Sequence, residues 1–130
     1  MAYLLIVDDD EDFADAVAKL LHSLGHEVDV ELRAQNAINR MEMRIPDLVI
    51  LDVMFPESNI AGFELAEKIH ANERLKGVRI ILLTAVNEKI PYGFSTKNFD
   101  SKHLPVDDFV EKPVDLAVLK RKITQALEKK

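Results

Sequence analysis

The sequence predicts an α/β fold in which a parallel β-sheet is covered by helices on both faces. Three observations predict this fold class. The chain has 130 residues, of which 48% are hydrophobic, so one compact domain with a substantial core is expected. Short apolar runs alternate along the chain with segments whose apolar residues recur at helical spacing. Several of the short runs are apolar at every position, which is typical of strands that are buried on both faces.

Five short apolar runs are expected to form the strands of the sheet. They lie at residues 3–7, 27–32, 47–53, 78–85 and 108–113. In the run at 27–32, acidic residues alternate with apolar ones, a pattern that favours a less buried strand at the edge of the sheet. The runs at 3–7, 47–53 and 78–85 contain unbroken apolar stretches and are predicted to be central strands.

Helices are expected between and after these strands. Residues 13–24 carry apolar side chains at helical spacing, and Gly25 supplies a stop signal. Residues 34–43 and 63–72 are predicted as two further helices, and 116–127 as the last one. Because helices connect successive strands, the sheet is predicted to be parallel.

The segment 86–107 does not fit this alternation. It contains Pro91, Gly93 and Pro105, which leave room for at most one short helix. A connection of this length is usually functional or mobile. We expect an irregular region where a regular fourth helix would otherwise lie.

Composition excludes several classes of protein and site. The chain has no cysteine, so disulfides, thiolate metal sites and cysteine nucleophiles are excluded. No basic segment precedes the first apolar run, and no stretch approaches the length of a membrane span, so a cytoplasmic location without membrane contact is expected. The net charge of −6 argues against direct binding of nucleic acid.

Chemically reactive side chains lie at the carboxyl ends of four of the predicted strands. The first strand ends in Asp8 and Asp9, the third in Asp52, the fourth in Thr84 and the fifth in Lys112. In an open parallel sheet, ligands bind beyond the carboxyl ends of the strands, so these five residues are expected to converge. Three carboxylates repel one another unless a hard cation such as Mg²⁺ binds between them. A carboxylate beside bound Mg²⁺ can act as a nucleophile toward a phosphoryl group.

Each of these residues also has an ordinary structural interpretation. Asp9 or Asp10 can cap the first helix, Asp52 can begin a loop, and Thr84 is a common β-branched strand residue. Lys112 can be a solvated lysine. Their joint placement at the ends of four strands favours a shared site.

Together these residues resemble the receiver domains of two-component response regulators, the CheY-like family. The resemblance rests on the acidic pair Asp8–Asp9, on Asp52 after "LVIL", on Thr84–Ala85 after "RIILL" and on "FVEKP" around Lys112. It covers nearly the whole chain. It implies a flavodoxin-like, doubly wound sheet of five parallel strands in the order 2-1-3-4-5.

The resemblance also implies a role for each acidic residue. Asp52 corresponds to the phosphate acceptor of the family. Asp8, Asp9 and Asp52 correspond to the Mg²⁺ site, which the backbone carbonyl of Met54 completes.

Further roles follow from the same resemblance. Thr84 and Lys112 correspond to the residues that bind the phosphoryl oxygens, with Ala85 beside Thr84 in the same group. Phe109 corresponds to the aromatic residue that changes rotamer on activation. Pro113 has a structural role, since the peptide bond before it is often cis in the family, although a proline at a helix start needs no function.

Two segments depart from the family pattern. The loop "VMFPESNIAG" has Phe55–Pro56 where Met-Pro is usual and takes a longer path to Gly62, so access to Asp52 is expected to differ. The segment 86–107 is longer than the usual fourth helix with its loops, so the usual output surface is in question.

The implied function is that of a phosphorylation-controlled signalling module. Its expected partners are a sensor histidine kinase or a histidine phosphotransfer protein, and a downstream protein target of unknown identity. A magnesium-dependent phosphatase of the haloacid dehalogenase type is one alternative, but it requires an aspartate where this chain has Met54. A flavin-binding carrier is another, but it requires a hydroxyl- and glycine-rich loop after the first strand. We therefore expect no enzymatic activity beyond self-phosphotransfer and autodephosphorylation.

The sequence leads to further expectations about organisation and output. Residues 1–130 are expected to form a single, stand-alone receiver domain, either a monomer or a phosphorylation-dependent dimer. Its output surface is expected to include 86–107, which should lie beside the Asp52 pocket and gain protection from hydrogen exchange on phosphorylation. That segment carries exposed candidate anchors at Ile90, Tyr92, Phe94 and Phe99.

Overall fold

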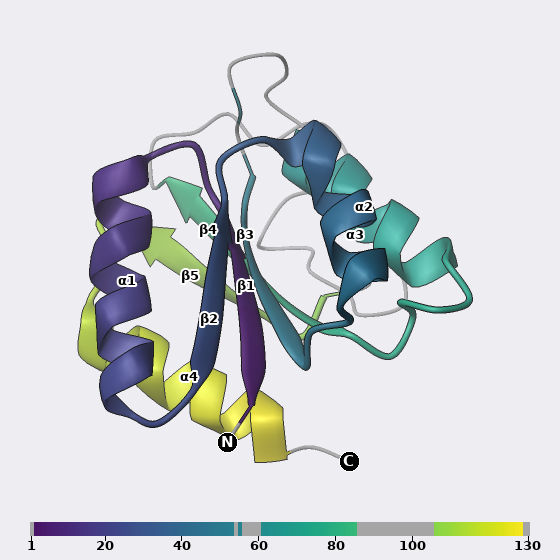
Figure 1. The fold of residues 1–130 in the computed structure, drawn as a ribbon. Coiled ribbons are helices and arrows are strands. Elements are labelled where there is room, and N and C mark those ends of the chain that lie inside the picture. The colour runs from purple at the N-terminus through teal and green to yellow at the C-terminus, as the bar shows by residue number, and fades with distance from the viewer. Residues whose placement is uncertain (1, 54, 56–60, 86–105, 129–130) are drawn as a thin grey trace.

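A computed structural model describes residues 2–53, 55, 61–85 and 106–128 of the chain (Figure 1). The strands of this part are β1 (Tyr3–Val7), β2 (Glu27–Glu31), β3 (Leu48–Asp52), β4 (Arg79–Ala85) and β5 (Asp108–Lys112). Its helices are α1 (Glu11–Ser23), α2 (Ala34–Met43), α3 (Ala61–Ala71) and α4 (Leu116–Glu128). Among the described residues, no helix is both long enough and apolar enough to cross a membrane.

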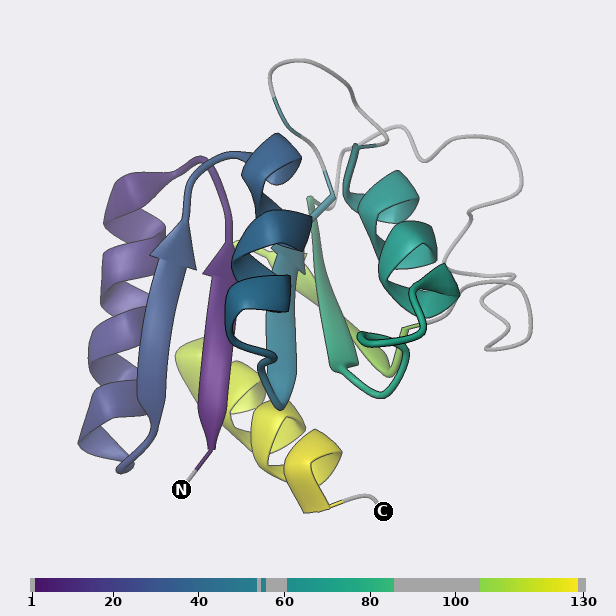
Figure 2. The same ribbon diagram turned by 45° about the vertical axis from the view of Figure 1, so that its right-hand side comes forward.

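The five strands form one parallel sheet in the order β2-β1-β3-β4-β5, which confirms the predicted topology. β1 lies between β2 and β3, so that β2 forms one edge of the sheet (Figure 2). Every residue of β1 and β3 is buried, whereas β2 is partly exposed along its length. The alternation of acidic and apolar residues therefore identified the edge strand correctly.

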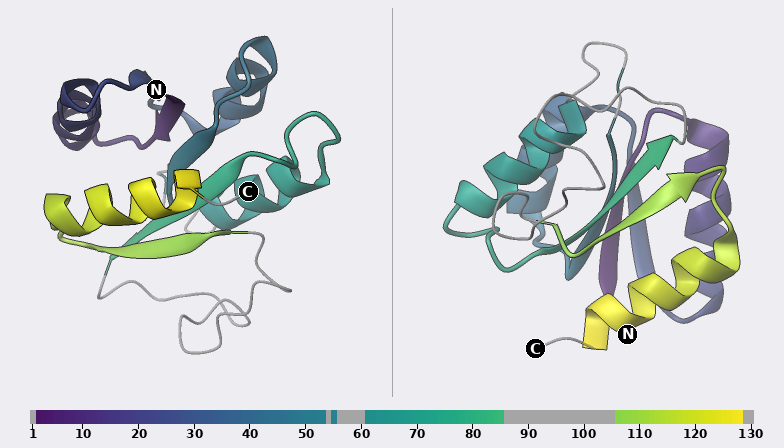
Figure 3. Two further views of the ribbon diagram at one scale, coloured as in Figure 1. Left: turned by 90° about the horizontal axis from the view of Figure 1, so that it is seen from below. Right: turned by 180° about the vertical axis from the view of Figure 1, so that it is seen from behind.

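Successive side chains of each strand point to opposite faces of the sheet, and this alternation divides the core into two clusters. On one face, Leu5, Val49 and Leu82 pack with residues of α2 and α3. On the other face, Ile6 and Ile50 pack with residues of α1 and α4. Figure 3 shows the sheet with one pair of helices on either side. We call these sides the α2/α3 face and the α1/α4 face.

The helix signals in the sequence have clear structural counterparts. Asp10 caps the start of helix α1, and its side chain accepts a hydrogen bond from the backbone N–H of Phe13 at 3.1 Å. It ends before Gly25, which adopts a φ of 90°, a conformation that glycine accepts without strain. Helix α2 has the predicted bounds, and α3 begins two residues earlier than predicted, at Ala61.

The structure does not test the expectations for most of the segment 86–107. Within that segment only Val106 and Asp107 are described. Val106 is buried in the α2/α3 face, and the Asp107 carboxylate accepts a hydrogen bond from the Ile80 N–H at 2.8 Å. The predicted irregular region and the candidate anchor residues lie outside the described residues.

Candidate functional site

The alternation of side-chain direction along each strand places three charged residues on one side of the sheet. Asp8, Asp52 and Lys112 each lie two positions after a strand residue that packs in the α1/α4 face. Since side chains two positions apart in a strand share a face, all three project toward the α1/α4 side at the carboxyl ends of their strands. The structure thus places three of the five residues that were expected to converge on one side of the sheet.

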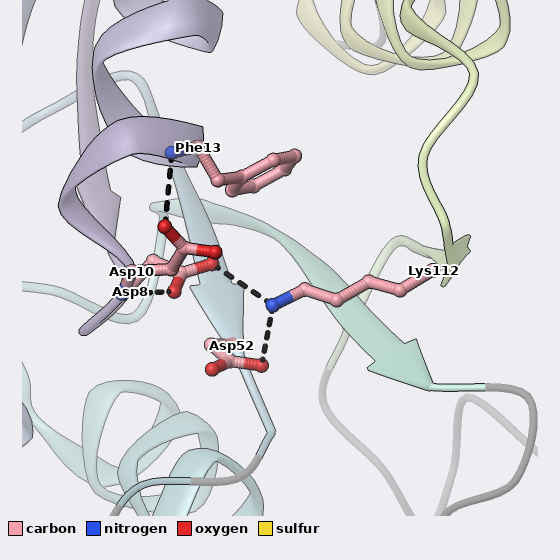
Figure 4. Close-up of polar contacts among 5 residues, drawn as sticks. All are labelled: Asp8, Asp10, Phe13, Asp52 and Lys112. Carbon is pink, nitrogen blue, oxygen red and sulfur yellow. Dashed lines mark hydrogen bonds and ion pairs between the residues drawn. The ribbon is translucent and has the colours of Figure 1, made fainter.

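The lysine side chain reaches both aspartates (Figure 4). Lys112 Nζ lies 3.3 Å from Asp8 Oδ2, to which it donates a hydrogen bond, and 3.5 Å from Asp52 Oδ1. Asp8 is 0% exposed and Asp52 is 4% exposed, whereas the Lys112 side chain is 27% exposed. Two buried carboxylates are thus paired with one ammonium, which leaves the group with a net negative charge.

A third carboxylate joins this group at the surface. Asp8, Asp9 and Asp52 each offer one oxygen, and these oxygens lie within 4.8 Å of one another. Asp9 is exposed, whereas the other two are buried. A set of carboxylate oxygens that is partly open to solvent suits a small divalent cation that keeps some of its water, as Mg²⁺ does. The residues therefore fit the expected metal, while Met54, whose carbonyl was expected to complete the site, lies outside the described residues.

Burial and charge repulsion shift the acid–base equilibria of the site. Burial, followed by the nearby charge of Asp8, raises the pKa of Asp52 to about 7. Burial also raises the pKa of Asp8, against the opposing effect of the Asp10 backbone N–H and of Lys112. Burial lowers the pKa of Lys112, but the charges of Asp52 and Asp8 outweigh it and the net shift is upward. Lys112 therefore stays charged, but its single positive charge cannot balance the ionised carboxylates of both Asp8 and Asp52.

Local hydrogen bonds fix the loop between β1 and α1. The Asp8 carboxylate accepts a hydrogen bond from the Asp10 N–H at 2.9 Å, and Asp10 in turn caps α1 through Phe13. Of the two residues considered as caps, Asp10 caps the helix and Asp9 belongs to the carboxylate group. This division of roles explains the run of acids after β1.

Helix α3 approaches the end of β3 very closely. The Gly62 N–H donates to the Val53 carbonyl at 2.9 Å. A Cβ atom at position 62 would lie 2.1 Å from the Asp52 carbonyl oxygen and 2.5 Å from Val53 Cα. Glycine is thus required at this position because any side chain would collide with the backbone of Asp52. In the sequence, Gly62 marks only the end of the unusual loop after Asp52.

Thr84 and Phe109 lie on the opposite face from Lys112. Leu82 packs in the α2/α3 face and is the ladder partner of Phe109, which packs against the same cluster. Thr84 lies two residues after Leu82, so it shares this side of the sheet. Thr84 is buried, and the residue before it, Leu83, is the ladder partner of Asp52. The expected switch pair thus shares one face, next to the strand that carries Asp52.

The remaining predicted site residues lie close to this group along the chain. Ala85 is the ladder partner of Lys112. Pro113 follows Lys112 through a cis peptide bond, as the resemblance implied. Phe55, part of the unusual loop after β3, is buried in the α2/α3 face.

One residue of the site was missed by sequence reasoning. The ring of Phe13 lies beside Lys112, with Nζ 5.1 Å from the ring centroid (Figure 4). In the sequence, Phe13 is simply the first apolar residue of an amphipathic helix. Nothing in the helical spacing indicates a contact with a residue that lies nearly a chain length away.

Comparisons with known proteins agree with this geometry. A family model described as the response regulator receiver domain matches residues 4–124. The phosphate regulon transcriptional regulatory protein PhoB of Rhizobium meliloti is 29% identical over 126 residues, which cover 97% of this chain and 52% of that protein. An uncharacterized 14.6 kDa protein of Leptolyngbya boryana is 30% identical over 122 residues, which cover 94% of this chain and 87% of that protein.

Solved structures show the same fold. The crystal structure of the receiver domain of NtrX from Brucella abortus superimposes with a TM-score of 0.79 at 26% sequence identity, over 98% of this chain and 99% of that one. The chain spans about half the length of the first curated relatives that it matches.

Proposed function

Because the chain belongs to the response regulator receiver domain family, we propose that it is a phosphoacceptor module of a two-component signalling system. Its phosphoryl donor is the phosphohistidine of a sensor histidine kinase or of a histidine phosphotransfer protein. The observation that carries the proposal is the pairing of buried Asp52 with Lys112, beside the carboxylates of Asp8 and Asp9.

Asp52 is the nucleophile in this proposal. Its carboxylate oxygen forms a bond to phosphorus, while the bond between phosphorus and the donor nitrogen breaks and the imidazole leaves with the electron pair. The reaction requires the ionised carboxylate. The raised pKa of Asp52, about 7 in the metal-free protein, means that a positive charge at the site increases the reactive fraction.

Asp8, Asp9 and Asp52 are the side chains that would hold Mg²⁺, together with the backbone carbonyl of Met54. When bound, the metal supplies positive charge that offsets the carboxylates and the incoming anionic donor. Asp8 is fixed for this role, because one of its oxygens accepts the Asp10 N–H and the other faces Lys112.

Lys112 and Thr84 bind the phosphoryl oxygens in this proposal. Lys112 already lies 3.5 Å from Asp52, so its ammonium can donate to an oxygen of the group that forms there. Thr84 brings a hydroxyl from the neighbouring strand β4, with the Ala85 backbone directly after it.

In this proposal, phosphorylation of Asp52 changes the conformation of the domain. Thr84 moves to bond the phosphoryl group, and the space it leaves lets Phe109 turn inward on the same face of the sheet. Their shared face and the ladder pairing of Leu82 with Phe109 support this coupling. The output is then a changed affinity for a partner protein, and the module is not an enzyme in the ordinary sense. The phosphatase alternative gains no support from the residues around Asp52.

Intact mass spectrometry tests the assignment. We expect wild-type protein to gain the mass of one phosphoryl group from acetyl phosphate in the presence of Mg²⁺. Asp52→Asn should gain none, and Asp12→Asn, which alters an exposed acid in the first turn of α1, should behave like wild type. Labelling of Asp52→Asn at the wild-type rate, or full labelling in excess chelator, would rule out this site.

A further inference from the structure

Phe13 is the only aromatic residue of α1, and its ring lies against the charged end of Lys112. The ammonium nitrogen is 5.1 Å from the ring centroid, within the range of about 6 Å over which an aromatic face attracts a cation. Phe13 is partly buried, and Lys112 approaches it from β5, on the opposite side of the site from α1. The contact therefore connects the first helix with the last strand.

This contact closes a ring of interactions around the site. Asp8 accepts the Asp10 N–H, Asp10 accepts the Phe13 N–H, and the Phe13 ring contacts Lys112. Lys112 completes the ring by donating to Asp8. The helix cap thus fixes the backbone that carries the aromatic ring, and the ring position is tied to that of Asp8.

The aromatic contact differs from the two ion pairs in one important respect. The carboxylates of Asp8 and Asp52 attract Lys112 less strongly when a cation binds them. The Phe13 ring carries no charge to be neutralised, so its attraction for the ammonium persists.

We infer that Phe13 is a positioning residue. It keeps the Lys112 ammonium directed at Asp52 when a cation is bound to the carboxylates of Asp8 and Asp52. The inference rests on the proposed function, in which Lys112 binds the phosphoryl oxygens. Without Phe13, the Lys112 side chain, which is already 27% exposed, turns outward into water.

Phe13 also packs against the core of the α1/α4 face, so a simple loss of packing must be distinguished from a loss of positioning. Phe13→Leu keeps an apolar side chain and removes the aromatic face. Phe13→Tyr keeps the aromatic face. Tyr also preserves most of the packing of Phe at this partly buried position, so the two roles are separated by a control that loses packing without removing the ring.

Nuclear magnetic resonance of the metal-free protein tests the contact without phosphorylation. We expect the Lys112 Hε signals to be shifted upfield by the Phe13 ring in wild type and in Phe13→Tyr, and to return toward ordinary lysine values in Phe13→Leu. Val17→Ala is the matched control, because Val17 is a buried residue of the same helix and face. It should lower stability and leave the Lys112 signals in place. Unshifted Lys112 signals in wild type would overturn the inference.

Phosphorylation kinetics test the consequence. At saturating Mg²⁺, we expect Phe13→Leu to lower the maximal rate of modification by acetyl phosphate by about 2- to 5-fold, with Phe13→Tyr close to wild type. Equal rates for wild type and Phe13→Leu would overturn positioning by Phe13. If wild type itself is not modified, the proposed function fails, and loss of the ring-current shift in Phe13→Leu still supports the contact.

Discussion

The ionised carboxylate of Asp52 lowers the stability of the folded protein, because it is buried and lies beside the carboxylate of Asp8. Its pKa of about 7 in the folded protein exceeds the value of 3.8 expected for an unperturbed aspartate. The folded protein therefore binds the proton more tightly than the unfolded chain does. The contribution of Asp52 to stability is fully present below about pH 4 and is lost as the pH rises through about 7.

This linkage predicts that Asp52→Asn stabilises the metal-free protein at neutral and alkaline pH. The gain in the free energy of unfolding should reach at most about 4 kcal/mol near pH 8 and shrink toward zero below about pH 3, where Asp52 is protonated in both states. Urea denaturation at several pH values, with chelator present, measures it. A gain that is the same at every pH would contradict the assigned pKa shift.

Thr84 gives a second prediction at the scale of single residues. Thr84→Ala removes the hydroxyl that we propose bonds the phosphoryl group, so this variant should accept phosphate and then change conformation only weakly. Amide spectra before and after addition of a phosphoryl mimic such as beryllofluoride provide the measurement. Shifts at Phe109 as large as in wild type would show that the two residues are not coupled.

Some residues of the site could be predicted from short stretches of the sequence, and others could not. Asp8, Asp52 and Lys112 were predicted to converge because each lies at the carboxyl end of a strand, and parallel strands end at the same edge of a sheet. The contact between Phe13 and Lys112 could not be predicted in this way. The contact depends on the rotation of α1 over the sheet. Side-chain packing sets this rotation, and no short sequence motif indicates it.

At the scale of elements, the junction between β3 and α3 depends on one glycine. Gly62→Ala places a Cβ atom against the backbone of Asp52, so α3 must move away from the strand end. We expect a loss of about 1–3 kcal/mol in the free energy of unfolding and slower phosphorylation of Asp52.

Gly77→Ala is the matched control for this prediction, because a Cβ atom there meets no other atom within 4 Å. It should be neutral or slightly stabilising. Equal stability of the two alanine variants would mean that α3 can move away from the end of β3 without lowering the free energy of unfolding.

The cap of α1 gives the next prediction. Asp10→Ala removes the acceptor for the Phe13 N–H and should cost about 0.5–2 kcal/mol, whereas Asp10→Asn keeps an acceptor and should cost much less. Thermal denaturation distinguishes the two variants. Identical losses would point to the charge of Asp10, rather than its hydrogen bond, as the stabilising feature.

Most helices and strands could be predicted because the spacing of apolar residues within each segment indicates them. The strand at 3–7 and the helix at 34–43 have the bounds that the sequence predicts. The other strands were predicted one or two residues too long. Hydrophobicity continues past the last ladder pair, as at Val53, which is buried beyond the end of β3.

At the scale of the whole molecule, the net charge of the site links folding to metal binding. We expect Mg²⁺ to raise the melting temperature of wild type, because the ion binds carboxylates that only the folded chain brings together. A concentration of 100 times the dissociation constant should add about 2.7 kcal/mol. Asp8→Asn should reduce the effect, and Asp12→Asn should not. An equal rise in all three proteins would indicate non-specific ion binding.

The order of the strands has a consequence for the protein while it is being made. Asp8 and Lys112 are 104 residues apart, and β3 and β4 lie between their strands in the sheet. During synthesis, a chain that ends after β4 carries the three aspartates without Lys112. In the proposed function, Lys112 binds the phosphoryl oxygens at Asp52. We therefore expect the site to be complete only after β5 has joined the sheet.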